Sequence, residues 1–236
     1  VIETINRRDY SIDLFKKFFK SMRMDIYYNK CNDFKHTLKY MEGSAAVIGD
    51  FMLPLLILNK EKQNKALKYA RDLGRAFQLT NMIRDIGEDL DFGRQYIPEN
   101  ICEIYKINIH KRDYKQKYWG EFMEHLFLLT DKYYNSADIG IAMIDDDVRE
   151  VIKVARIMYY KIHDKIRENN YDIFNGKISV SFNEKIYYIY SHLSIFNLLR
   201  IIFIECISLI IWNANLLFIL AWANLNSTII FDSNGN

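Results

Sequence analysis

The sequence predicts an all-α protein, from how rarely it is interrupted and from its periodicity. Its 236 residues include only two prolines, Pro54 and Pro98, and nine glycines, so few positions would break a helix. Between them, apolar residues recur every three or four positions within stretches of Lys, Glu, Ile, Leu and Tyr, which is the spacing of one helix face. With 50% hydrophobic residues, the chain can bury one substantial core without disulfides or structural metals.

The first two predicted helical stretches cover residues 1–30 and 34–58. The first is interrupted near Tyr10 and has apolar residues at helical spacing beyond that point. The second contains the run GSAAVIG, Gly43 to Gly49, whose small side chains allow a neighbouring backbone or a ligand to come close. Pro54 should bend the helix that follows this run.

Three longer helical patterns come next. Residues 62–90 form the longest and end before a glycine and a proline, as a helix terminus should. Residues 114–135 and 145–170 repeat the pattern, and the second opens on an acidic triplet that complements a helix N-terminus. We therefore expect residues 1–190 to form one helical bundle domain.

The C-terminal tail, residues 191–236, differs in composition. Residues 201–223 form a run in which Glu205 is the only formally charged residue, and the run is long enough to cross a bilayer. Two asparagines weaken that interpretation, and a buried terminal helix is the alternative. If the run spans a membrane, the basic residues that precede it would keep the main domain on the cytoplasmic side.

Charge and cysteine content bound the class of protein. The formal net charge is +2 and the basic residues are spread along the chain, so no nucleic-acid partner is expected. The three cysteines, Cys31, Cys102 and Cys206, lack the paired spacing of a zinc site or a disulfide framework. A reducing compartment, the cytoplasm, is the simpler interpretation.

The segment from Gln78 to Pro98 carries the candidate chemistry. On a helix, five of its polar residues fall in one sector: Gln78, Asn81, Asp85, Glu88 and Asp89. Like charges four residues apart repel one another unless a cation neutralises them. Mg²⁺ prefers oxygen ligands and often takes one or two protein carboxylates beside water and phosphate. A solvated acidic helix face is the alternative explanation for the bare pair of aspartates.

Several collinear segments resemble the squalene/phytoene synthase family, the head-to-head type of trans-isoprenyl diphosphate synthase. They are SMRMD (Ser21 to Asp25), YMEGSAAVIGDFMLP (Tyr40 to Pro54), QLTNMIRDIGED (Gln78 to Asp89), Gly-Arg-x-Tyr-x-Pro (Gly93 to Pro98) and NNYDIF (Asn169 to Phe174). The second segment is similar to bacterial phytoene synthases. Agreement over about residues 1–190 is far more specific than one short motif.

The resemblance implies an isoprenoid synthase-type helical bundle around a central apolar cavity. It also implies a transferase that condenses two prenyl diphosphates head to head, most simply two geranylgeranyl diphosphates to phytoene, in carotenoid and isoprenoid biosynthesis. The implied metal ligands for Mg²⁺, or Mn²⁺ in its place, are Asn81, Asp85 and Asp89. The implied catalytic residues are Asp85, Asp89, Arg84 and Tyr40. The implied substrate-binding residues are Gln78, Asn81, Arg94, Tyr96 and Tyr159.

The sequence departs from the family at its N-terminus. Family members carry a first aspartate-rich motif upstream of the segment that matches SMRMD, whereas this chain begins at Val1. We interpret Val1 as a truncation point, with the N-terminal helices missing, and expect the polypeptide as it stands to lack condensing activity. Asp9 and Asp13 have the spacing of that motif but occupy the wrong place for it.

Other functions stay open at this point. A squalene synthase-type enzyme would use farnesyl diphosphate and would also need NADPH, which phytoene synthesis does not. A non-catalytic family member could act as an assembly or scaffold protein, although it would have no need for Asn81, Asp85 and Asp89. A membrane-anchored binding module would rest on residues 201–223 alone. We expect membrane association, and no particular protein partner is indicated.

Overall fold

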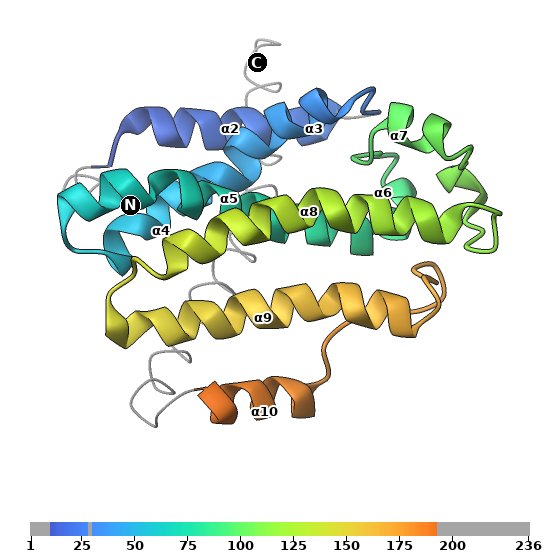
Figure 1. Cartoon of the computed structure of the whole chain (residues 1–236). Coiled ribbons are helices and arrows are strands. Elements are labelled where there is room, and N and C mark those ends of the chain that lie inside the picture. The colour runs from blue at the N-terminus through green and yellow to red at the C-terminus, as the bar shows by residue number, and fades with distance from the viewer. Residues whose placement is uncertain (1–9, 28–29, 193–236) are drawn as a thin grey trace, which may run out of the picture. The chain divides into compact units, whose positions relative to one another are not determined.

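The computed structural model describes residues 10–27 and 30–192, and these residues form a helical domain (Figure 1). The first helix, α2, covers Ile12–Tyr27, within the first predicted stretch. A continuous helical segment follows, made of α3 (Phe34–Met41), a π-helical turn η1 (Glu42–Ala46) and α4 (Val47–Leu56). The prediction of helix over residues 34–58 is confirmed, with the π turn as an addition.

The longest predicted helix is divided in two by the structure. Helix α5 covers Lys60–Arg84 and α6 covers Ile86–Asp91, with Asp85 between them at φ −100° and ψ 16°. The Asp85 N–H still donates to the Asn81 carbonyl (2.8 Å), and the Asp89 N–H to the Asp85 carbonyl (2.8 Å). The hydrogen bonding of a helix therefore persists across the break, and only the backbone direction changes at Asp85.

The second half of the domain begins with two short elements, α7 (Glu99–Ile104) and the 3₁₀ turn η2 (Ile109–Lys111). Helices α8 (Trp119–Ile141), α9 (Asp146–Glu168) and α10 (Phe182–His192) follow. The start predicted for α8 was wrong by five residues, because the Gln116 side chain binds the Asn108 backbone and holds this stretch in a turn. Helix α9 matches its predicted span, with Asp145 as its N-cap residue.

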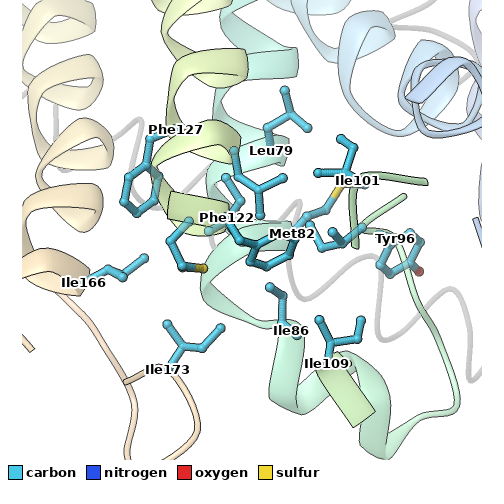
Figure 2. Close-up of a cluster of buried hydrophobic side chains, with 14 of the residues drawn as sticks. Leu79, Met82, Ile86, Tyr96, Ile101, Ile109, Phe122, Phe127, Ile166 and Ile173 are labelled. Carbon is cyan, nitrogen blue, oxygen red and sulfur yellow. The ribbon is translucent and has the colours of Figure 1, made fainter. Parts of the chain in front are cut away.

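Helix α5 lies at the centre of the domain and packs against α4, η1, α8 and α9. Helices α8 and α9 run antiparallel beside each other, and α2 packs against η1 and α4 (Figure 1). The main core cluster gathers around Leu79, Met82 and Ile86 on one side of α5 and α6, facing Phe122 and Phe127 of α8 (Figure 2). The central helix thus carries core residues on one face and the polar residues of the candidate site on another.

Glycines allow the N-terminal helices to pack very close to one another. A Cβ atom on Gly43 would overlap the Lys17 carbonyl oxygen of α2, and one on Gly49 would lie 2.5 Å from the Ala70 carbonyl oxygen of α5. Neither contact is tolerable for a side chain. The predicted close approach at the GSAAVIG run is therefore confirmed, and it is an approach of backbones.

Three sequence predictions concern positions at the ends of the chain. The apolar run 201–223, Cys206 and Asp9 lie outside the described residues. Among the helices that the structure does describe, none is both long and apolar enough to span a membrane. Cys31 and Cys102 are buried free thiols.

Candidate active site

The aspartate-rich face lies where α5 passes into α6. Asn81 and Asp85 are one turn apart at the end of α5, and Asp89 follows one turn later in α6. All three side chains are half-buried, whereas Glu88, which the helical wheel placed beside them, is exposed. The structure therefore keeps one amide and two carboxylates as the inward-facing set.

Asn81 has an unsatisfied polar atom. Its side-chain oxygen Oδ1 is buried and has no hydrogen-bond partner among the residues that the structure describes. Leaving a buried acceptor without a partner costs about 1–3 kcal/mol, so such groups usually bind something. An amide oxygen on the same helix face as two carboxylates is the ligand type that Mg²⁺ prefers.

The two aspartates of this face differ in their surroundings. The Arg84 guanidinium binds Asp85 with two hydrogen bonds, from Nε to Oδ1 (2.7 Å) and from Nη2 to Oδ2 (2.6 Å). Within the described residues no side chain pairs with Asp89 in this way, and burial, together with the nearby charge of Asp85, raises its carboxyl pKa to about 7. A bound divalent cation would relieve both causes, because it favours the ionised form.

Tyr40 is held by α2 at both its backbone and its side chain. The Ser21 hydroxyl donates to the Tyr40 carbonyl oxygen (2.9 Å), and the Tyr40 hydroxyl donates to Asp25 Oδ2 (3.1 Å). Ser44, in the π turn that follows α3, also donates to the Tyr40 carbonyl (3.2 Å). Ser21 and Asp25 are one helical turn apart, so the segment SMRMD has a clear structural role in fixing Tyr40.

Tyr96 reaches the same carboxylate from the other end of the site. Gly93 adopts φ +69° after α6, a left-handed conformation that glycine takes readily, and this turns the chain back toward α3. There the Thr37 hydroxyl donates to the Tyr96 carbonyl (3.0 Å), and the Tyr96 hydroxyl donates to Asp25 Oδ1 (2.7 Å). In Figure 2 the Tyr96 ring lies at the edge of the core cluster with its oxygen pointing away from it.

Asp25 is therefore a site residue that the sequence predictions did not include. It accepts one hydrogen bond from each tyrosine, and the two rings lie 5.0 Å apart between centroids. Burial raises its carboxyl pKa, while the two tyrosine hydroxyls and the charge of Arg94 act in the opposite direction. The signal that could have found Asp25 is its position at the end of SMRMD, a segment that the sequence comparison matched to the family without giving any of its residues a function.

The remaining predicted site residues are Arg94, Tyr159 and Gln78. Arg94 makes no ion pair within the described part of the chain, yet its charge acts on both Asp25 and Asp89. Tyr159 of α9 stacks on Phe77 of α5, with ring centroids 4.1 Å apart, and lies within electrostatic reach of Arg84. Gln78 is half-buried, one turn before Asn81.

The donor set fits a magnesium ion. Within the described residues no three His, Cys, Asp or Glu side chains gather as a protein-only metal site would. Mg²⁺ does not need such a cage, because it keeps several waters and takes phosphate oxygens beside one or two carboxylates. Asn81 Oδ1 and the carboxylates of Asp89 and Asp85 would hold it, with Arg84 sharing Asp85.

The fold and this polar face together define a helical protein of the isoprenoid synthase type. The comparisons with known proteins make the assignment specific, since residues 1–184 match the family described as squalene/phytoene synthase. The chain belongs to the squalene/phytoene synthase family. This confirms the family and the fold class that the sequence motifs implied.

Curated relatives and solved structures agree with this assignment. The chain is 29% identical over 196 residues to phytoene synthase from Arthrospira platensis, and 28% identical over 195 residues to 15-cis-phytoene synthase from Synechococcus elongatus. Each match covers 76% of this chain and 62% of the relative. A crystal structure of a dehydrosqualene synthase has a TM-score of 0.70 at 24% identity, covering 77% of this chain and 64% of that one. YisP from Bacillus subtilis has a TM-score of 0.70 at 19% identity, covering 79% and 74%.

Proposed function

We propose that this chain is part of a metal-dependent prenyltransferase that joins two prenyl diphosphates head to head, with Mg²⁺ as the metal and Mn²⁺ as an alternative. Membership of the family and the phytoene synthases among its relatives support this activity. The chain spans about 62% of the length of the first of these relatives. The reaction of the whole protein is therefore proposed on the basis of the site that this part contains.

One observation carries the proposal. Asn81 Oδ1 is a buried acceptor without a partner, and it lies on the same helix face as a carboxyl group whose pKa burial raises to about 7. The face is therefore unfavourable by itself and becomes favourable when it holds a cation. When bound, the metal ion would neutralise charge on the diphosphate and so assist its departure.

The chain's own residues have separate roles in this reaction. Arg94, which is free of ion pairs within the described residues, would contribute its charge to the diphosphate, and Asn81 and Asp89 would fix the metal-bound end of the substrate. Arg84 would hold Asp85 in place, as its two hydrogen bonds already do. Tyr159, stacked on Phe77, would line the path of the hydrocarbon chain and keep water from it.

Geranylgeranyl diphosphate is the substrate that we propose, with phytoene as the product and no need for NADPH. The curated relatives named above are phytoene synthases, which favours this choice over farnesyl diphosphate and a squalene-type product. We also propose that the protein works in the cytoplasm at a membrane surface, because substrate and product are both lipids.

The test is calorimetric titration of the 236-residue chain with geranylgeranyl thiodiphosphate, a non-hydrolysable analogue, with and without Mg²⁺. Binding that requires Mg²⁺, and that Asp89→Asn weakens by about tenfold or more, is the expected result. Asp13→Asn is the matched control and should bind like the wild type, because Asp13 is exposed and pairs, within the described residues, with Lys16. If the analogue binds equally well with and without Mg²⁺, or does not bind at all, the result would contradict the proposal and favour a non-catalytic scaffold protein.

The same titration, repeated with a farnesyl analogue, tests the length of the prenyl chain that the site prefers. Tighter binding of the geranylgeranyl analogue than of the farnesyl analogue is expected for a phytoene-type enzyme. The reverse order would favour the squalene-type alternative while leaving the metal-dependent site intact.

A further inference from the structure

The segment that joins α7 to α8 is strongly basic. Residues 104–118 include five basic residues and one acidic residue, although the whole chain has a formal net charge of only +2. The basic residues, all exposed, are Lys106, Lys111, Arg112, Lys115 and Lys117. Arg112 forms an ion pair with Asp91, whereas the four lysines form none within the described residues. The sequence indicated basic residues spread along the chain, and this segment is a local exception.

The fold holds the basic segment against the core. Ile107 and Ile109 are buried, and the Gln116 side chain binds the Asn108 backbone twice, accepting from its N–H (2.9 Å) and donating to its carbonyl oxygen (3.0 Å). The apolar residues thus anchor the segment from below. Its lysine side chains are left to project from the surface.

Exposed apolar side chains accompany these cations. Ile104 is 69% exposed, and Phe92, in the turn after α6, is 67% exposed. The Lys117 ammonium lies 5.0 Å from the centre of the Tyr118 ring, and the Arg94 guanidinium 5.7 Å from that of Phe92. Single exposed apolar residues are ordinary on a protein surface. Apolar and aromatic side chains among unpaired lysines, however, are the composition of a surface that meets lipid.

The basic segment lies beside the metal-binding face. Arg112 connects it to α6, because its Nη2 donates to the Gly87 carbonyl oxygen (3.2 Å) and the side chain pairs with Asp91. Asp91 comes two residues after Asp89. Figure 1 shows α6, α7 and the connecting segment at the same end of the domain. Whatever binds the basic segment therefore lies close to the proposed diphosphate site.

We propose that this basic surface binds a bilayer that contains anionic phospholipids. The surface consists of Lys106, Lys111, Lys115, Lys117, Ile104 and Tyr118. Its charge complements lipid phosphates, and its exposed apolar side chains, which enter the headgroup boundary, favour lipid over an acidic protein. The inference deepens the proposed function and rests on its membrane location. A prenyl diphosphate dissolved in the bilayer has its diphosphate among the headgroups, which places it next to the metal-binding face.

Co-sedimentation of the full 236-residue chain with vesicles tests the charged part, without substrate or Mg²⁺. The vesicles are pure phosphatidylcholine, or phosphatidylcholine in which roughly a third of the lipid is phosphatidylglycerol. The double variant Lys111→Gln/Lys115→Gln should bind the anionic vesicles about tenfold or more weakly, since each lysine near such a surface contributes about fivefold. Its affinity for the neutral vesicles should not change.

The matched control is Lys68→Gln/Lys132→Gln, which removes the same charge from exposed lysines of α5 and α8. It should weaken binding by less than about twofold, because charges far from the bilayer are screened by salt. Binding by other parts of the chain is common to all variants and cancels in the comparison. Equal losses in the two double variants, or no loss in either, would overturn the proposal.

Ile104→Ser tests the apolar part of the surface. It should weaken binding to the anionic vesicles by about fivefold, because the side chain no longer leaves water for lipid. Leu58→Ser, at a position that is 78% exposed after α4, is its control and should bind like the wild type. If Ile104→Ser also binds like the wild type, the proposed contact with lipid is wrong.

Titration of the lysine variant with the geranylgeranyl thiodiphosphate and Mg²⁺, without vesicles, separates this inference from the proposed function. Its affinity should equal that of the wild type. If it binds the thiodiphosphate less tightly but keeps its affinity for vesicles, the lysines serve the substrate and the lipid surface is wrong. If the wild type fails to bind the thiodiphosphate, the proposed function fails, whatever the vesicles show.

Discussion

Asp25 and Tyr96 are 71 residues apart in the chain and are joined by a hydrogen bond of 2.7 Å. The bond connects α2 to the segment that follows α6, and a second bond from Tyr40 brings α3 to the same carboxylate. Three separate elements therefore meet at one partly buried negative charge. Hydrogen bonds to a charged group contribute about 1.5–3 kcal/mol each, so this junction affects stability as well as function.

Tyr96→Phe is expected to lower the free energy of unfolding by about 2 kcal/mol at pH 7. Burial already raises the carboxyl pKa of Asp25, and the Tyr96 bond opposes that increase, so the variant should raise the pKa further. Because the lost bond is to the ionised form, the difference from wild type should shrink as the pH falls and Asp25 becomes protonated. Urea unfolding at several pH values measures both effects.

Tyr105→Phe is the control for this experiment, since Tyr105 packs against Phe122 and its hydroxyl makes no hydrogen bond within the described part of the chain. It should change stability by less than about 0.5 kcal/mol. A Tyr96→Phe difference that stays constant from neutral to acid pH would show that the ionised carboxylate is not the acceptor.

Gly43→Ala is expected to destabilise the domain by about 2 kcal/mol or more. The added methyl group would overlap the Lys17 carbonyl oxygen and the Ser21 hydroxyl, so α2 would have to move away from η1. Such a movement would also loosen the Ser21 and Asp25 contacts to Tyr40. Gly120→Ala, where the nearest atom lies 3.6 Å from the new Cβ, should be neutral or stabilising by up to about 1 kcal/mol. Thermal unfolding of the two variants gives the comparison, and equal melting temperatures would contradict it.

The sequence predicted the helices well because their signals are local. The apolar period and the acidic start of α9 are each visible in one stretch of chain. The break at Asp85 was missed, because periodicity continues through it and the residue changes only its backbone angles. The late start of α8 was missed because the Gln116 contact to Asn108 is a local detail that periodicity does not encode.

The candidate site was predictable only in part. Asn81, Asp85 and Asp89 follow one another at four-residue intervals, and helical hydrogen bonding continues from α5 into α6, so their common face follows from helical periodicity. The junction at Asp25 depends on residues 15 and 71 positions away, and no periodicity links them. The pairing of Arg84 with Asp85, its immediate neighbour, also differs from the partner one turn away that a regular helix suggests, since the backbone turns at that point.

Asn81→Leu is expected to leave the metal-free domain as stable as the wild type, or to stabilise it by about 1 kcal/mol. The substitution removes a buried oxygen that has no hydrogen-bond partner among the described residues, and the cost of that unsatisfied group is lost with it. Leucine also has the higher helix propensity. In the presence of Mg²⁺ and inorganic diphosphate the wild type should gain stability by ligand binding and the variant should not. Urea unfolding with and without these ligands measures the free energy of unfolding of both proteins. A large loss of stability in the variant without ligands would contradict the expected removal of an unsatisfied group.

His163 is expected to make the domain sensitive to acid. The ring is fully buried between α5, α8 and α9, with Nε2 3.1 Å from the Thr80 hydroxyl and Nδ1 without a partner in the described part of the chain. Burial and the nearby Arg167 lower its pKa from 6.5 to about 3, so the folded state keeps the ring neutral while the unfolded state protonates it. Stability from this group is complete above pH 6.5 and is lost as the pH falls toward 3, by about 1.4 kcal/mol per pH unit. His163→Gln should flatten this dependence between pH 6.5 and 4, whereas Thr80→Val, which keeps the histidine and removes its partner, should lower stability and keep the slope. A variant without the histidine that loses stability as steeply as the wild type over that range would assign the acid sensitivity to other groups.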